Sequence, residues 1–419
     1  MKLFDEEVSA SKTYFRGTHR SVAPAETLRR FSPCLPALGI TRLADITGLD
    51  GIGLPVYVAI RPNSRALATS QGKGFDHDSA KASAMMESIE SWHGERPEIP
   101  LVHDSHRALL RRHAAVDPLL LPASAGATPR RDVPYLWARG WDLVSEQWTY
   151  VPYDAVTVNF VLPPGYRSTF AMSSNGLSSG NHALEATVHA LCEVIERDAH
   201  SLWSLGGTDA KRRTAVDLAS VDDDACRLVL SLLERAGIGV AAWDMTSDTG
   251  VPAYVCQIVE RPDQARWRTI GPAGGCGCHL SPAVALMRAL TEAVQSRLTL
   301  IAGSRDDRFY RSYEAFRSRD NLERAWKVLA QTGRDAAPFH AHAALDGPSF
   351  EDDVRTLVER LRAVGVTSAA VVDLSRGEIG IPVVKVVVPG LEGHHEIATH
   401  RAGPRAAARV GLATNTRSA

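Results

Sequence analysis

The pattern of apolar and polar positions along the chain predicts helices and strands that alternate over most of its length. Apolar residues recur at helical spacing over 223–237, where Gly237 ends the helix, and again over 315–330 and 350–365. The stretches GVAAWDM and IPVVKVVVPG predict buried strands, the second stopped by Pro-Gly. The helical segments and the strand segments together predict an α+β (mixed α/β) fold.

One predicted helix, over 189–200, carries an unusual polar face. Its sequence, HALCEVIERDAH, places His189, Glu193, Glu196 and His200 on one side of the helix, beside residues that favour burial. Two carboxylates one turn apart repel each other, and removing them from water is costly unless a positive charge lies between them. We therefore expect Glu193 and Glu196 to bind a positively charged group.

This helix has two relatives within the same chain. Segments 82–92 and 287–297 align without gaps with 188–198, which indicates an internal repeat. One column then holds Glu87, Glu193 and Glu292, and the column three residues later holds Glu90, Glu196 and Gln295. Three ordinary acidic surface helices are the simpler interpretation, but the shared register argues against it.

A strand, a glycine-rich turn and a helix start precede each of the three segments. Asp76, Asp78, Asn181 and Ser281 are candidate helix caps, and Pro282 suits a first helical turn. Glycines let backbone N–H groups come close to a ligand, and helix N-termini attract anions. We therefore predict that three strand–turn–helix units bring their carboxylates to one central cleft.

Composition narrows the class of protein. The 419 residues, 44% hydrophobic and 23% charged, are typical of a globular enzyme, and the net charge of −1 predicts neither nucleic-acid nor membrane binding. Six cysteines in so long a chain do not form a disulfide scaffold. Without an apolar signal core or an 18-residue apolar run, we expect a cytoplasmic protein.

Clustered glutamates suit a hard cation. Mg2+ prefers oxygen ligands and completes its shell with water and substrate phosphates, so Glu193 and Glu196 are predicted to face Mg2+ that carries a nucleotide triphosphate. Basic side chains would neutralise the phosphates, with Lys12, Arg20, Arg197 and Arg288 as candidates. The P-loop motif is absent, so the nucleotide would bind in another way.

These motifs resemble the YcaO family of ATP-dependent enzymes that activate peptide-backbone amides. The resemblance runs from about residue 66 to 405 and rests on SAMMESIE, SSNGLSSGNHALEATVHALCEVIERDA and RALTEAVQSRLTLIAGSRDD. It implies the YcaO fold, with 1–58 contributing to the nucleotide site, 59–405 forming the YcaO domain and 406–419 as a flexible tail. It also implies a homodimer.

The family's site residues carry over by position. The implied Mg2+ ligands are Glu87, Glu90, Glu185, Glu193, Glu196 and Glu292. The implied ATP contacts are Lys12, Thr18, Arg20, Ser83, Asn181, Glu185, Arg197, Arg288 and Gln295. We expect Glu193, Glu196 and Arg288 to take part directly in catalysis.

The resemblance implies that a nucleophile adds to an amide carbonyl and that the oxyanion then takes the γ-phosphoryl group of ATP. A sulfur donor gives a thioamide, whereas a Cys, Ser or Thr side chain of the substrate gives an azoline. The stretches IAGSRDD and VVKVVVPGLEG are similar to members that work beside a TfuA partner, and the C-terminal NTRSA lacks a proline-rich ending. We therefore rank thioamide formation above azoline formation and expect a TfuA-like or other peptide-delivering partner.

Other motifs offer weaker alternatives. GLSSG over 176–180 matches a nucleophile elbow, so a serine hydrolase would use Ser178, Asp373 and His394 or His395. A non-catalytic scaffold is the remaining rival. Cys276, Cys278 and His279 lack a second pair at zinc spacing, although a sulfur-relay role for either cysteine is a hypothesis. His93 lies three residues after Glu90 and is interpreted as structural.

Overall fold

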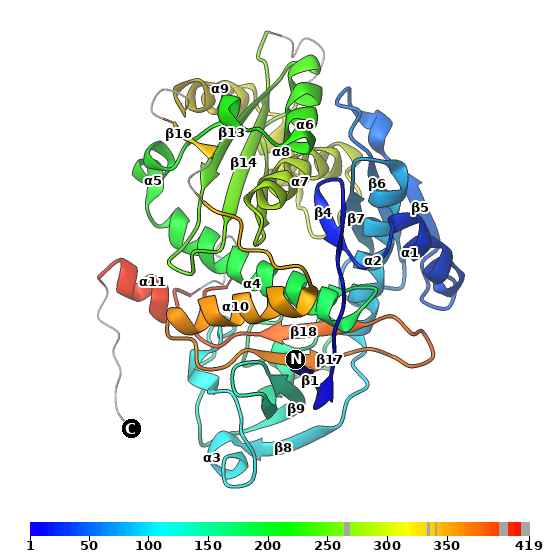
Figure 1. The fold of residues 1–419 in the computed structure, drawn as a ribbon, viewed down its shortest axis with the longest axis vertical. Coiled ribbons are helices and arrows are strands. Elements are labelled where there is room, and N and C mark those ends of the chain that lie inside the picture. Colours follow the sequence, from blue (N-terminus) through cyan, green and yellow to red (C-terminus); the bar gives the residue numbers. More distant parts are fainter. Residues whose placement is uncertain (264–268, 333–335, 340–341, 394–400, 412–419) are drawn as a thin grey trace.

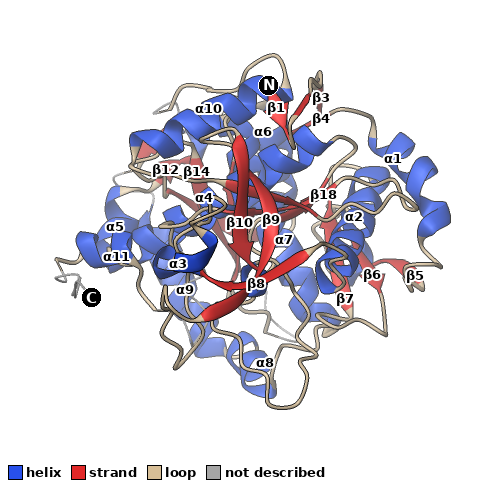
Figure 2. Cartoon of the chain, turned by 90° about the horizontal axis from the view of Figure 1, so that it is seen from below, coloured by secondary structure: helices blue, strands red, loops and turns tan. Residues whose placement is uncertain are grey.

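A computed structural model describes residues 1–263, 269–332, 336–339, 342–393 and 401–411, and its largest sheet has six antiparallel strands (Figure 1). The strand order is β10-β9-β17-β18-β11, and β8 pairs with β9 beside this path. These strands are β8 (Leu101–Ser105), β9 (Pro134–Asp142), β10 (Gln147–Pro152), β11 (Leu177–Ser179), β17 (Ala370–Asp373) and β18 (Val383–Val387). Figure 2, seen from below, shows β8, β9 and β10 across the middle of the molecule.

Two smaller antiparallel sheets have three strands each, in the orders β5-β6-β7 and β13-β14-β15. Their strands are β5 (Arg42–Asp45), β6 (Val56–Ile60), β7 (Thr69–Lys73), β13 (Ile238–Asp244), β14 (Ala253–Glu260) and β15 (Ala273–Cys278). Short strands form three further pairs: β1 (Lys2–Leu3) with β2 (Glu6–Glu7), β3 (Thr13–Phe15) with β4 (Thr18–Arg20), and β12 (Val216–Asp217) with β16 (Ala337–Pro338). The predicted mixture of helices and strands is confirmed.

Three long helices each follow an edge strand of a different sheet. They are α2 (His77–Glu95) after β7, α4 (Ala183–Ser204) after β11, and α7 (Pro282–Ala302) after β15. They meet near the middle of the molecule (Figure 1). The predicted strand–turn–helix repeat is therefore present, with one unit drawn from each sheet.

The helix caps agree only in part with the sequence prediction. Asp76 caps α2 by accepting a hydrogen bond from the Ser79 amide, as expected. The cap of α4 is His182 instead of Asn181, because the imidazole accepts from the Leu184 amide. Ser281 occupies the cap position of α7 without a side-chain cap bond, and Pro282 lies in the first turn as predicted.

Several glycines of the three units allow close packing of a strand on a helix, whereas the sequence predicted that they allow close approach to a ligand. A Cβ at Gly72 would lie 2.0 Å from the Ala84 amide nitrogen, and one at Gly277 would lie 2.1 Å from the Ala285 carbonyl oxygen. Glycine lets these strands touch the backbone of the following helix directly. Gly74 and Gly180 do line the central cavity, so ligand approach remains a role for the turn glycines only.

Each long helix buries its apolar side in a separate hydrophobic cluster, which leaves its polar side free to face inward. The clusters contain Leu191 and Ile195 of α4, Leu290 and Val294 of α7, and Met85 and Ile89 of α2. The helix α10 (Phe350–Ala363) packs against α4. The other helices are α1 (Pro24–Phe31), α3 (His106–Leu109), α5 (Gly207–Arg213), α6 (Asp224–Arg235), α8 (Tyr310–Phe316), α9 (Arg319–Thr332) and α11 (Pro404–Arg409).

The helix α11 overlaps the start of the expected tail, and residues 412–419 lie outside the described part of the chain. The helix is anchored to α4, because the Arg405 guanidinium donates to both carboxylate oxygens of Asp198 at 2.9 and 3.0 Å. Among the residues described, no helix combines the length and apolar character needed to cross a lipid bilayer.

Candidate active site: an acidic cavity between three helices

A cavity of about 950 Å³ lies between α2, α4, α7 and the N-terminal hairpin β3–β4. All six glutamates expected to bind Mg2+ line it: Glu87, Glu90, Glu185, Glu193, Glu196 and Glu292. The expected ATP contacts that line it are Thr18, Arg20, Ser83, Asn181, Glu185, Arg197, Arg288 and Gln295. The repeat thus brings three distant stretches of sequence to one place.

Lys12 is the expected contact that the structure does not bring to the cavity. Its ammonium donates to Asp353 at 2.7 Å and lies 3.6 Å from Asp346, and its side chain is buried. A buried lysine between two carboxylates is held as an ion pair, so it is not free to meet a phosphate. Lys12 instead joins the N-terminal segment to α10.

The α2 carboxylates differ in how they are held. Glu90 accepts hydrogen bonds from the amide and hydroxyl of Ser179, at 2.9 and 2.8 Å, which joins α2 to the strand before α4. Burial raises the pKa of Glu90 to about 8, although these bonds favour the ionised form. The Glu87 side chain is accessible from the cavity. Desolvation by the surrounding cavity walls raises the pKa of its carboxyl.

The α4 carboxylates have a cation beside them and another beneath them. Glu196 lies 3.3 Å from Arg197, and burial still raises its pKa. Burial raises the pKa of Glu193 to about 7, with Glu196 adding to the effect and Arg197 and Lys385 opposing it. The cations of the protein therefore offset only part of the cost of burying the charged Glu193 and Glu196.

Glu292 on α7 is the exception among the glutamates. Its carboxylate accepts from Lys73 at 3.0 Å and from the Cys276 amide at 3.2 Å. Burial would raise its pKa, but Lys73 and Arg197 outweigh burial and lower the pKa to about 2. Glu292 is therefore a fixed negative charge, and Lys73 ties β7 to α7.

The N-terminal segment closes one wall through Glu185. The Ser21 hydroxyl donates to this carboxylate at 2.5 Å and the Arg20 guanidinium lies 3.8 Å from it. Beside them, Asn181 and Thr27 are hydrogen-bonded at 3.0 Å. These contacts explain how residues before 30 reach a site that is built mainly by later sequence.

His189, which shares a face with Glu193, meets Arg288 instead of a metal ligand set. The Arg288 guanidinium donates to its Nδ1 at 2.8 Å, so this nitrogen is an acceptor. Burial and the charge of Arg288 hold the His189 pKa well below its usual range, which keeps the ring neutral. His200 stacks on Trp203 and does not line the cavity.

The site fits Mg2+ carried by a nucleotide. Buried carboxylates with raised pKa values are stabilised by an added cation. In the described part of the chain, no three His, Cys, Asp or Glu side chains are grouped tightly enough to hold a metal ion by themselves. Mg2+ bound with a nucleotide takes ligands from phosphates and water, so carboxylates spread around a shared cavity are suitable partners.

Four lining cations were not among the predicted site residues: Arg16, Lys73, Arg305 and Arg308. Lys73 is the last residue of β7 and lies between Gly72 and Gly74, one position before a glycine that lines the cavity, and this position in a glycine-rich stretch is the signal in the sequence. Arg305 lies in the IAGSRDD stretch, but the sequence does not show that Arg305 and Arg308 reach the cavity, because their position depends on a loop folding back to β7. Within that loop Asp306 accepts from the Ala68 amide at 3.3 Å.

The serine hydrolase interpretation is wrong. Ser178 is fully buried in β11, and its hydroxyl points to the Ser179 carbonyl. A nucleophile elbow needs an exposed serine at a sharp turn. His394 and His395 lie outside the described residues, and Asp373 is exposed at the end of β17.

The cysteines and His93 are buried as well. Burial and its contact with Cys192 raise the pKa of Cys278 well above its usual range, which makes it a poor nucleophile. Cys276 is buried too, and its amide serves Glu292. His93 is fully buried with its Nδ1 2.8 Å from the Ile89 carbonyl oxygen, which agrees with the structural interpretation.

A mixed α/β fold with a cavity that combines glutamates, arginines and a lysine defines an enzyme of the class that binds a nucleotide together with a divalent cation. Residues 71–392 match a family model described as YcaO cyclodehydratase, ATP- and Mg2+-binding. The chain belongs to the YcaO family. It is an ATP-dependent peptide-modifying enzyme whose cofactors are ATP and Mg2+.

Two relatives match over nearly the whole chain. One, a Rhizobium leguminosarum bv. trifolii protein from the tfuA 3′ region, is 36% identical over 382 residues, which are 89% of this chain and 88% of the relative. The other, from Methanothermobacter thermautotrophicus, is 35% identical over 378 residues, which are 89% of this chain and 95% of the relative.

Solved structures share the fold at lower identity. A heterocyclase in complex with substrate and cofactor has a TM-score of 0.76 at 23% identity, and the match covers 93% of this chain and 54% of that one. This chain thus spans about half the length of that heterocyclase. YcaO from Methanopyrus kandleri, bound with AMPPCP and Mg2+, has a TM-score of 0.70 at 23% identity, with 94% and 99% covered. The expected YcaO fold is confirmed.

Proposed function

We propose that the protein converts backbone amides of a ribosomally made peptide into thioamides, beside a TfuA-like partner. The observation that carries this proposal is the 36% identity to a protein from a tfuA region, spread over 89% of the chain. An identity at this level over most of both chains favours a shared reaction. We also propose a homodimer, which the family resemblance implies.

We assign the lining residues as follows. Glu87, Glu90, Glu193 and Glu196 hold Mg2+, because their charge is only partly balanced by the protein. Arg20 and Arg288 bind the phosphates, as they line the same cavity from the N-terminal hairpin and from α7. Bound ATP and Mg2+ supply the phosphoryl group that turns an amide oxygen into a leaving group.

The chain's own contribution to this chemistry is positioning and charge. The neutral His189 keeps Arg288 directed into the cavity through their hydrogen bond. The Glu185 contacts with Ser21 and Arg20 hold the N-terminal wall in place, so this segment, residues 1–58, is part of the nucleotide site. Fixed groups of this kind lose little energy to reorganisation when charge develops on the substrate.

Mass spectrometry of a reconstituted reaction tests the proposal. The protein, a TfuA-like protein, a candidate precursor peptide, ATP, Mg2+ and sulfide are combined, and the mass of the product is measured. A thioamide gains sulfur and loses oxygen, whereas an azoline loses water. Glu193→Gln should lower product formation on the order of 100-fold, while Glu359→Gln, on the exposed side of α10, should retain activity.

Azoline formation is the second candidate, and the family description as a cyclodehydratase favours it. Loss of water without added sulfide would establish this outcome and overturn thioamidation. ATP consumption with and without peptide separates both reactions from a non-catalytic scaffold, which would show no peptide-dependent turnover.

A further inference from the structure

A group of apolar residues lines the cavity beside the loop that carries Arg305 and Arg308. Ala66, Leu67 and Phe160 line the cavity there, and Val161 and Leu162 continue from Phe160. Phe160, Val161 and Leu162 are 52%, 65% and 38% exposed. We call these five residues the apolar rim. Three consecutive large apolar side chains open to solvent beside a catalytic cavity are typical of a surface that another molecule covers.

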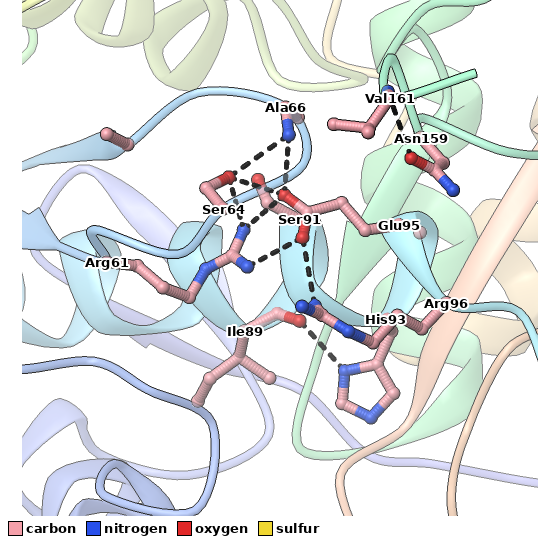
Figure 3. A network of polar contacts seen from close by, with 12 residues as sticks. Arg61, Ser64, Ala66, Ile89, Ser91, His93, Glu95, Arg96, Asn159 and Val161 are labelled. Carbon is pink, nitrogen blue, oxygen red and sulfur yellow. Dashed lines mark hydrogen bonds and ion pairs between the residues drawn. The ribbon is translucent and has the colours of Figure 1, made fainter. Parts of the chain in front are cut away.

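A buried polar network holds one half of the apolar rim from behind (Figure 3). Arg61 donates to both carboxylate oxygens of Glu95, at 2.7 and 2.5 Å, and both side chains are almost completely buried. The same carboxylate accepts from the Ser64 hydroxyl at 2.5 Å and from the Ala66 amide at 2.9 Å. This network fixes the backbone at the position where the chain reaches the cavity.

The other half of the apolar rim is attached to the first. The Phe160 amide donates to the Arg65 carbonyl at 3.0 Å, and the Val158 amide donates to the Gly94 carbonyl at 2.8 Å. The Val161 amide donates to the Asn159 side chain at 3.1 Å. The exposed apolar side chains therefore stand on a backbone held by hydrogen bonds, which lowers the entropy cost of binding.

We propose that the apolar rim binds the part of the peptide substrate next to the modified amide, through apolar side chains of the peptide. The rim lines the same cavity as Glu90, so it adjoins the space that a peptide amide enters to reach the carboxylates. Five residues are far fewer than the 20–30 on each side of a standard protein–protein interface, so a second copy of the chain fits this surface poorly.

The inference rests on a peptide being the substrate, and it holds whether the product is a thioamide or an azoline. Phe160→Ser and Val161→Ser each remove apolar area that the peptide would cover. Steady-state ATP consumption is measured while peptide and ATP are varied in turn. We expect KM for the peptide to rise roughly tenfold, equivalent to about 1.4 kcal/mol, without a matching rise in KM for ATP.

Leu119→Ser is the matched control, since Leu119 is 48% exposed and does not line the cavity. An unchanged KM for the peptide, or an equal rise in both constants, would overturn the proposal. A photo-reactive phenylalanine analogue at position 160 gives a second measurement. Crosslinking to the peptide supports the proposal, whereas crosslinking to a second copy or only to the partner protein refutes it. If mass spectrometry finds no thioamide but these peptide effects persist, the reaction type alone is wrong.

Discussion

Replacing Lys385 with methionine removes a buried positive charge from beneath the cavity. Lys385 lies in β18 with 2% of its surface exposed, and its ammonium donates to the carbonyls of Ser173 and Asn175 at 2.5 and 2.7 Å. Those residues belong to a loop that lines the cavity. We predict that Lys385→Met changes how stability depends on pH.

The size of the effect follows from burial. Burial lowers the pKa of Lys385 from 10.5 to about 8, although Glu193 opposes the change. At roughly 1.36 kcal/mol per pH unit, keeping this lysine charged in the folded state costs about 3 kcal/mol. Because the unfolded chain binds the proton more tightly, stability should rise with pH between about 8 and 10.5.

Urea unfolding without ATP or Mg2+ measures this dependence. Between about pH 7 and pH 9.5 the wild type should gain about 2 kcal/mol relative to Lys385→Met. The comparison uses differences because buried glutamates act in the opposite direction: their raised pKa gives stability at low pH that is lost as pH rises through the folded value. Lys327→Met, at an exposed site on α9, controls for the loss of one lysine.

Parallel pH profiles for wild type and Lys385→Met would refute the reasoning. They would mean that burying the charged Lys385 costs no net free energy, because the hydrogen bonds to the two carbonyls and the nearby Glu193 fully offset the loss of solvation. A steeper profile in the variant would contradict even the sign of the effect.

Three further predictions concern the support of the cavity and its cations. Arg61→Met should lower the free energy of unfolding by about 3 kcal/mol, because the buried Glu95 then keeps its hydrogen bonds to Ser64 and Ala66 but only the ion pair with Arg96; urea midpoints test this, and a loss below about 1 kcal/mol would contradict it. Binding of Mg2+ with a non-hydrolysable nucleotide should tighten as pH rises through about 8 and release protons, because the Glu90 carboxyl must ionise. Calorimetry in two buffers should show that Glu90→Gln releases fewer protons than the wild type. Equal proton release by the two proteins would refute the assignment. Gly277→Ala should cost several kcal/mol or prevent folding, since its Cβ would meet the α7 backbone at 2.1 Å, whereas Gly51→Ala, with nothing within 4 Å, should change the melting temperature little.

The sequence predicted which residues line the cavity better than it predicted the long-range contacts that hold them in place. The shared columns of Glu87, Glu193 and Glu292 were visible because helical side chains that face one cavity must recur in register. Each of the three sheets contributes one such helix, so the repeat in sequence became a repeat in structure.

What the sequence could not provide were the long-range partners. Lys12 carried the right charge for a phosphate, but Asp353, far along the chain, holds it elsewhere. Ser179 fixes Glu90, and Lys385 lies beneath Glu193, through contacts that arise only when the sheets have assembled. The strand glycines were misjudged because a close helix and a close ligand both favour glycine in the sequence.

Each of the three long helices leaves a different sheet, so the cavity comes into existence only when those sheets have docked. A fragment with one or two of the units would retain acidic helices without the walls that oppose them. A chain whose sheets have not docked therefore lacks the complete set of carboxylates and cations that surrounds the nucleotide.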